Sequence, residues 1–149
     1  MAPTPLPMWS NVMSMDTISP AERSEIMSRV RSKDSRPEMA LRKLVFSLGY
    51  RYRLHNRALP GCPDLVFSAL RKVVFVHGCF WHLHKNCPLA RMPKSRVDFW
   101  SSKLELNKTR DEKNVRKLRR LGWRVLTIWE CEIARNRRVS DKIMRFLNA

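Results

Sequence analysis

The stretch from Val73 to Cys87 constrains the fold of this chain more than any other. It opens with a β-branched and aromatic run, Val73 to Val76, which predicts a buried strand. The strand reaches His77 and ends at Gly78, and the next nine residues hold two cysteines, two histidines and two aromatic residues. A core strand needs no such set at its end, whereas a metal site does. The sequence therefore predicts a metal-binding loop fixed to a buried strand.

The net charge indicates the kind of partner. Thirty Lys and Arg against thirteen Asp and Glu give +17, and an excess of this size is typical of proteins that bind nucleic acid. A membrane surface is the competing partner, but no apolar run approaches the ~20 residues that span a bilayer. Residues 1–15 lack the pattern of a signal peptide and are expected to form a flexible tail. Four cysteines in a chain without a secretion signal favour reduced thiols and a cytoplasmic, nucleoid-associated protein.

Residues 16–149 are expected to form a single α/β domain. Apolar periodicity and capping signals predict helices at 19–32, from Ser35 to about Gly49, at 103–121 and from Ser140 onward. Strands are expected at 50–55, 65–67, 73–77 and 123–129. The helix between the last two strands requires that they pair in parallel across a crossover. Antiparallel pairing of the two strands before it would bring Asp64 close to Val76 and His77.

Two groups of residues are candidates for metal chemistry. Cys79, His84, Cys87 and Cys131 offer the four sulfur and nitrogen ligands of a structural zinc site, with Cys62 expected to stand apart. Buried free thiols beside an exposed histidine are the alternative. Asp64, with His77 and His82, offers an oxygen ligand for Mg²⁺ and imidazoles that can move protons. The plainer alternative makes Asp64 a turn residue and the histidines spare zinc ligands.

Three further features have both a structural and a functional interpretation. Glu38 has capping-box spacing from Ser35, which alone would explain it. Aromatic residues in polar loops can stack on bases or simply pack over the zinc site; they are Phe80, Trp81 and Trp100. The 103–121 helix carries basic residues that suit either solvent or phosphates: Lys103, Lys108, Arg110, Lys113, Arg116, Lys117, Arg119 and Arg120.

Four motifs taken together resemble one family, the very short patch repair (Vsr) DNA mismatch endonucleases. They are PGCPDL, HGCFWH, PKSRVDFW and LGWRVLTIWEC, and the resemblance extends from about Asp16 to Ala149. It implies a three-layer α/β/α fold with a central mixed sheet, of the restriction-endonuclease-like type. It also implies an enzyme that nicks one strand of duplex DNA 5′ to the T of a T:G mismatch, which arises when 5-methylcytosine deaminates.

The resemblance assigns roles to the residues of the PD-x(n)-(D/E)-x-K arrangement. Asp64 would hold Mg²⁺ together with the backbone carbonyl of Val76, a position where the family usually has Thr. Phe75 replaces the second acid and His77 takes the lysine position. Because Val76 stands where the family usually has Thr, any role of the threonine hydroxyl is lost in this chain.

The remaining roles follow from the same resemblance. His77 and His82 match the two histidines near the scissile phosphate, with His82 favoured for proton transfer, and Glu38 matches an active-site glutamate. Zinc would be held by the cysteines and histidine of the loop, and the three loop aromatics would insert beside the mismatch. A monomer linked to mismatch-repair factors is expected. The alternatives are a restriction-type nuclease that cuts both strands and a zinc-stabilised DNA-binding module without catalysis.

Overall fold

The computed structural model describes residues 34–135 and 137–149. The predicted tail and the predicted helix at 19–32 lie outside these residues. The elements, in chain order, are α3 (Arg36–Ser47), β1 (Arg53–Leu54), β2 (Leu65–Phe67), η1 (Ser68–Leu70), β3 (Lys72–His77), η2 (Pro88–Ala90), α4 (Val97–Arg120), β4 (Arg124–Trp129), α5 (Glu130–Arg135) and α6 (Arg137–Asn148).

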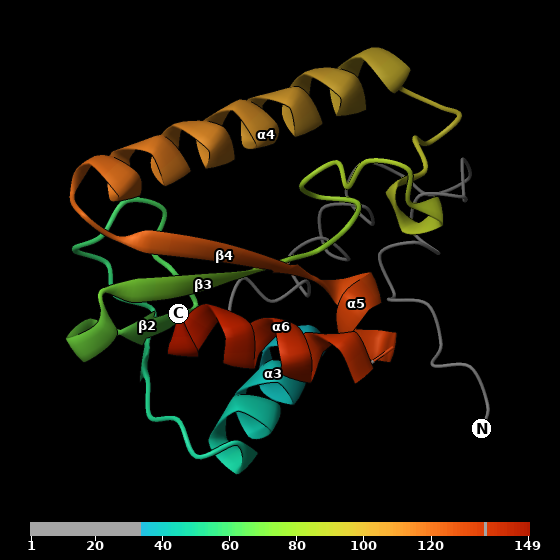
Figure 1. Ribbon diagram of the computed structural model, residues 1–149. Helices are drawn as coiled ribbons and strands as arrows, with labels where there is room; N and C mark the ends of the chain where they lie inside the picture. Colours follow the sequence, from blue (N-terminus) through green and yellow to red (C-terminus); the bar gives the residue numbers. More distant parts are fainter. Residues whose placement is uncertain (1–33, 136) are drawn as a thin grey trace.

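The four strands form one mixed sheet in the order β1-β2-β3-β4. β2 pairs antiparallel with both β1 and β3, and β3 pairs parallel with β4 from Lys72 opposite Arg124 to His77 opposite Trp129. The long helix α4 makes the crossover between β3 and β4 (Figure 1). The predicted parallel pairing is confirmed, and the paired ends place His77 and Trp129 at the same edge of the sheet.

Helices cover both faces of the sheet. α4 lies over one face, and α3, α5 and α6 lie over the other (Figure 1). Successive residues of β3 point to opposite faces: Val74 packs in the core against α3 and α6, whereas Val73 and Phe75 pack with Leu118 of α4. The predicted mixed α/β sheet is confirmed, and its helices form the two outer layers.

Three element boundaries differ from the predictions. The strand expected at 50–55 shrinks to Arg53–Leu54, and His55 adopts a left-handed conformation (φ 46°) that ends it. α4 begins at Val97 instead of residue 103, because the added turn buries Trp100. α6 begins at Arg137, so Ser140 lies inside that helix and does not cap it.

The ends of α4 illustrate the limits of the apolar pattern. The apolar pattern of this helix predicts Val115, Leu118 and Leu121 on its core side. Leu118 is fully buried, but Leu121 is 54% exposed at the turn into β4. Gly122 has φ 88° and ends the helix as predicted. Within the described residues, α4 and every other helix are too short or too polar to cross a bilayer.

Candidate active site and metal centre

Asp64 is held at the sheet edge by a tight turn. Gly61 has φ 77°, and a side chain there would press against Asn114 of α4 and Phe75 at 3.1 Å, so only glycine fits the turn. The chain then enters β2, and the Asp64 carboxylate (Oδ2) accepts a hydrogen bond from the Val76 N–H at 2.6 Å. The predicted proximity of Asp64 and Val76 is confirmed.

The charge state of Asp64 reflects its surroundings. Burial, together with the nearby Glu38 carboxyl, raises its pKa to about 7, against the lowering effect of the Val76 N–H and of Arg42. Ionising a buried carboxyl group next to a second carboxyl costs free energy when no cation is bound. A bound cation would remove that cost, so this pair of acids fits a divalent metal ion that prefers oxygen ligands.

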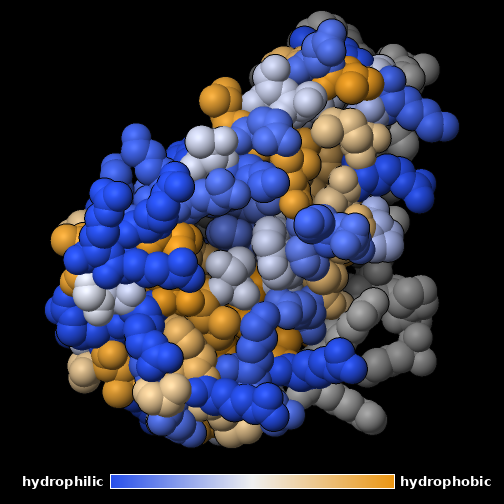
Figure 2. Space-filling view, turned by 45° about the horizontal axis from the view of Figure 1, so that its top comes forward, coloured by the Kyte–Doolittle hydropathy of each residue, from blue (hydrophilic) through white to orange (hydrophobic). Residues whose placement is uncertain are grey.

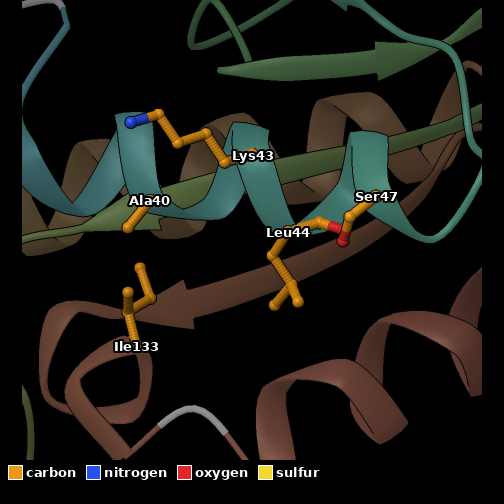
Figure 3. Close-up of a pocket in the computed structure, with 5 residues that line it drawn as sticks. All are labelled: Ala40, Lys43, Leu44, Ser47 and Ile133. Atoms are coloured by element: carbon orange, nitrogen blue, oxygen red, sulfur yellow. The ribbon is translucent and has the colours of Figure 1, made fainter.

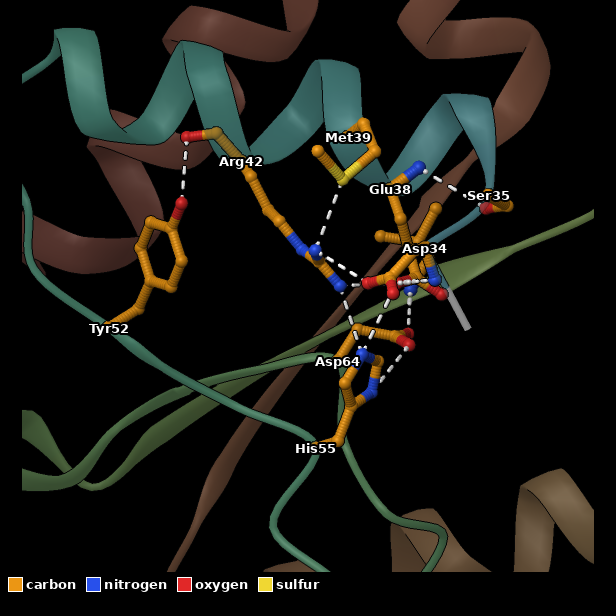
Figure 4. A network of polar contacts seen from close by, with 9 residues as sticks. Asp34, Ser35, Glu38, Met39, Arg42, Tyr52, His55 and Asp64 are labelled. Atoms are coloured by element: carbon orange, nitrogen blue, oxygen red, sulfur yellow. Dashed lines mark hydrogen bonds and ion pairs between the residues drawn. The ribbon is translucent and has the colours of Figure 1, made fainter. Parts of the chain in front are cut away.

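Glu38 does more than cap its helix. Ser35 caps α3 by accepting from the Glu38 N–H at 3.4 Å. The Glu38 side chain, however, accepts from the backbone N–H of Asp34 and binds the Arg42 guanidinium at 2.8 Å (Figure 4). It is one of three buried polar or charged residues among those described. Both interpretations of Glu38 therefore have a structural basis, and its catalytic role stays a prediction.

His77 and His82 lie against each other. Their rings stack at 3.9 Å with an interplanar angle of 6°, and Trp129 meets His77 edge-on at 5.3 Å. Burial, followed by the neighbouring His82, lowers the pKa of His77 to about 3. His77 is thus neutral at physiological pH and can offer or accept a hydrogen bond without carrying charge.

The structure adds Asp111 to this site. Asp111 lies on α4, and its carboxylate hydrogen-bonds to Nδ1 of His82. A carboxylate at Nδ1 fixes the ring orientation and stabilises a protonated imidazole, which leaves Nε2 as the nitrogen that can exchange a proton with a substrate. The sequence contains a signal for Asp111, since it lies seven residues from both Leu104 and Leu118 in the buried stripe of α4.

These groups surround one cavity of about 390 Å³. Its lining comes from α3, the Gly61 turn, β3, α4 and the loop of residues 78–87, called the metal loop below. The lining residues are Glu38, His55, Gly61, Cys62, Asp64, Phe75, Val76, His77, His82, Arg110, Asp111, Asn114 and Val115. A second cavity of about 460 Å³ lies between α3 and α5 and is lined by Ala40, Lys43, Leu44, Ser47 and Ile133 (Figure 3). That cavity contains no acid or histidine, so the catalytic candidates gather in the first.

The four predicted zinc ligands converge at the other side of His77. The ligand atoms of Cys79, His84, Cys87 and Cys131 all lie within 4.8 Å of one another. Nδ1 of His84 is 3.4 Å from the sulfur of Cys79 and 3.4 Å from that of Cys131. Ligands on a tetrahedral zinc are about 3.5–3.8 Å apart, given bonds of roughly 2.0–2.3 Å. The donor set and its spacing therefore fit zinc.

The surrounding contacts fix this centre to the sheet. His84 stacks on Trp129 at 4.1 Å, and the Cys79 N–H donates to Glu130 at 3.2 Å. Burial raises the pKa of the Cys79 and Cys131 thiols, which favours neutral thiols unless a cation is bound. Cys62 lies outside the cluster, as predicted.

The three predicted loop aromatics form a small core of their own, although Trp100 lies in the first turn of α4 and not in a loop. Phe80 and Trp100 are almost fully buried with Leu104, whereas Trp81 is partly exposed at the edge of the cluster. The Lys103 ammonium lies 5.7 Å from the Trp81 ring and 5.8 Å from that of Trp100. Packing over the metal loop is therefore real for Phe80 and Trp100, and insertion of the three rings into DNA stays a prediction.

The outer side of α4 is a basic surface. All eight basic side chains predicted there are exposed, and hydrophilic residues predominate over this helix in the space-filling view (Figure 2). Arg110 also borders the catalytic cavity. The helix therefore presents cations outward and an acid, Asp111, inward.

Comparison with known proteins agrees with this geometry. Residues 15–89 match the family described as DNA mismatch endonuclease Vsr. A type II nicking enzyme of Xanthomonas oryzae, V.XorIIP, is 51% identical over 80% of this chain and 87% of its own length. The DNA mismatch endonuclease Vsr of Escherichia coli is 37% identical over 87% of this chain and 82% of its own. The Neisseria meningitidis nicking enzyme V.NmeAIP is 38% identical over 89% and 94%.

Proposed function

The chain belongs to the Vsr family of DNA mismatch endonucleases, and from that premise we propose that it nicks one strand of duplex DNA 5′ to the T of a T:G mismatch. Repair of deaminated 5-methylcytosine would begin at that nick. The observation that carries the proposal is the single cavity shared by Asp64, His77, His82 and Asp111. This cavity brings the Asp64 carboxyl close to His82, whose ring hydrogen-bonds to Asp111, and so supports a role for Asp64 as a cation ligand beside a proton-transfer histidine.

Mg²⁺ would be held by Asp64, with the backbone carbonyl of Val76 as a further ligand. The raised pKa of Asp64 and the neighbouring Glu38 carboxyl support this assignment, because a cation between the two acids would offset the cost of ionising them together. When bound, the ion would neutralise charge on the attacked phosphate and lower the pKa of its water. Glu38 would orient groups around Asp64 without carrying the proton.

His77 and His82 would have different roles in the reaction. His82, oriented by Asp111, would exchange a proton through Nε2 during hydrolysis. The water oxygen would bond to phosphorus as its proton passes to Nε2 of His82. The bond from phosphorus to the 3′ oxygen would break, and that oxygen would leave as a hydroxyl after taking a proton from solvent water. His77, kept neutral by burial, would hydrogen-bond to the phosphate and hold the His82 ring in place by stacking.

Zinc would be structural in this scheme. It would bind Cys79, His84, Cys87 and Cys131 with no ligand position left open. The loop between the first two ligands carries His82 and Trp81. Cys131 lies at the start of α5, directly after β4, and fixing the loop there would hold His82 within reach of the scissile phosphate.

The basic face of α4 would bind phosphates without reading sequence. Trp81 is the partly exposed aromatic residue of the loop and would insert at the mismatch, where a weakly stacked T:G pair lowers the cost of opening. For Phe80 and Trp100, insertion would require that they leave their packed positions in the loop core.

The enzyme proposal is tested with Asp64→Asn, which keeps the shape of the side chain and removes its charge. The wild-type protein should nick a labelled T:G duplex in the presence of Mg²⁺, and the variant should lose nicking by at least ~100-fold while keeping DNA affinity within about twofold. Equal nicking by both proteins would reject Asp64 as the metal ligand. Double-strand cleavage of a matched plasmid would favour the restriction-type nuclease instead.

A further inference from the structure

Arg42 of α3 is a largely buried cation beside the catalytic acids, with a side chain 11% exposed. Its guanidinium contacts Asp34 through Nη1 and Glu38 through Nη2, both at 2.8 Å (Figure 4). The two carboxylates offset its charge. An arginine that served only solubility could lie at an exposed position of the same helix. The burial of Arg42 therefore indicates a local role.

The same guanidinium determines the chemistry of His55. Nη2 of Arg42 lies 2.9 Å from Nε2 of the His55 ring. Oε2 of Glu38 also lies 3.4 Å from this nitrogen, but Nη2 of Arg42 already donates to that oxygen at 2.8 Å. Because a guanidinium can only donate, the shorter contact favours Nε2 as the acceptor, and a neutral ring then carries its proton on Nδ1. Nδ1 is the nitrogen that faces Asp64, 3.8 Å from its Oδ1 atom.

We propose that Arg42 fixes His55 as the Nδ1–H tautomer and that His55 is thereby a positioning residue for Asp64. The Val76 N–H holds one carboxylate oxygen of Asp64, and the His55 Nδ1–H orients the other. A movement of less than about 1 Å would turn the present separation into a hydrogen bond. The inference rests on the proposed function, because Asp64 is the proposed magnesium ligand and such outer donors orient ligating carboxylates.

The backbone supports this arrangement. The His55 N–H donates to the Asp64 carbonyl at 3.4 Å, which ties the two residues together across β1 and β2. His55 has φ 46°, a conformation that directs its ring toward the cavity and that asparagine also tolerates. The hydroxyl of Tyr52 donates to the Arg42 carbonyl at 3.1 Å and so fixes the strand end to α3.

The tautomer can be measured without any catalytic assay. Long-range ¹H–¹⁵N spectra of histidine-labelled, zinc-loaded protein without added magnesium should show the neutral His55 ring protonated at Nδ1. Arg42→Met should move its population toward the Nε2–H form that free neutral imidazole favours. Lys43→Met, the matched loss of an exposed charge one residue away, should leave His55 unchanged. A wild-type His55 protonated at Nε2, or at both nitrogens, would overturn the proposal.

Positioning of Asp64 is measured by cation binding. Calorimetric titration of the DNA-free protein with Mn²⁺ should show roughly tenfold weaker binding in His55→Ala. His55→Asn, which retains an amide donor on the side of Nδ1 and accepts the left-handed backbone, should recover most of that loss. Thermal unfolding of each variant separates misfolding from altered binding, and Asp64→Asn identifies the site being titrated. Wild-type affinity in His55→Ala would overturn the positioning role, whereas nicking by the wild-type enzyme would still test the proposed function.

Discussion

At the scale of single residues, the site depends on pairs in which one side chain sets the chemistry of the other. Asp111 hydrogen-bonds to His82, burial and Glu38 raise the pKa of Asp64, and burial together with His82 lowers the pKa of His77. The reacting members can be predicted from the sequence, because they stand in short motifs. Their partners come from α3 and α4, far along the chain, and only the folded structure brings them together.

Removing the carboxylate of Asp111 should therefore impair proton transfer and leave binding intact. We expect Asp111→Asn to lower the single-turnover nicking rate by about 100-fold, within the range that general acid–base groups contribute. Affinity for a T:G duplex should change little, because Asp111 contacts His82 and not the phosphate backbone. Glu112→Gln, an exposed neighbour on α4, is the matched control. A rate within twofold of wild type would show that His82 does not need Asp111.

At the scale of elements, the metal loop and α4 differ in how far the sequence predicts them. The convergence of Cys79, His84, Cys87 and Cys131 could be predicted, because cysteine and histidine at a strand end have few structural uses. The start of α4 could not, because Arg96 begins the helix in a left-handed conformation without a side-chain cap. On the same side of α4, Asp111 and Asn114 line the cavity, and Asn107 donates to the Trp81 carbonyl, so these polar residues serve the site and the loop instead of the core.

The loop predicts a dependence of stability on zinc. Wild-type protein purified without chelator should contain about one equivalent of zinc, and Cys131→Ser should lose it. Since bound metal contributes to folding, the variant should unfold at least ~5 °C lower. Cys62→Ser, which removes a thiol outside the cluster, should keep both zinc and stability. Folded, active wild-type protein free of zinc would contradict the four-ligand site.

The exposed face of α4 predicts a salt-dependent share of DNA affinity. Replacing Lys113 and Lys117 with glutamine should weaken binding equally on matched and T:G duplexes. The slope of log affinity against log salt should fall by about one for each phosphate that no longer has a lysine beside it. The control is Lys43→Gln on α3, under the opposite face of the sheet. An effect confined to the mismatched duplex would instead assign these lysines to mismatch recognition.

At the scale of the whole molecule, the parallel β3–β4 pair connects the two centres. At its paired ends, Trp129 contacts both His84 of the proposed zinc site and His77, and His77 in turn stacks on His82. The parallel β3–β4 pairing and its crossover followed from the sequence pattern, because a buried strand, a long helix and a second strand have few ways to pack. The short length of β1 could not be predicted from the sequence, because it depends on the left-handed conformation of His55.

Mapping the nick on a panel of otherwise identical duplexes tests the central claim most directly. Each strand carries its own label, and the panel contains T:G, the other mismatches and the matched pairs. With Mg²⁺, the protein should cut the T-bearing strand once, immediately 5′ to the mismatched T, and leave the other strand and the matched duplexes intact. Cleavage of matched DNA at the same rate, or cuts in both strands, would contradict a mismatch-directed nicking enzyme.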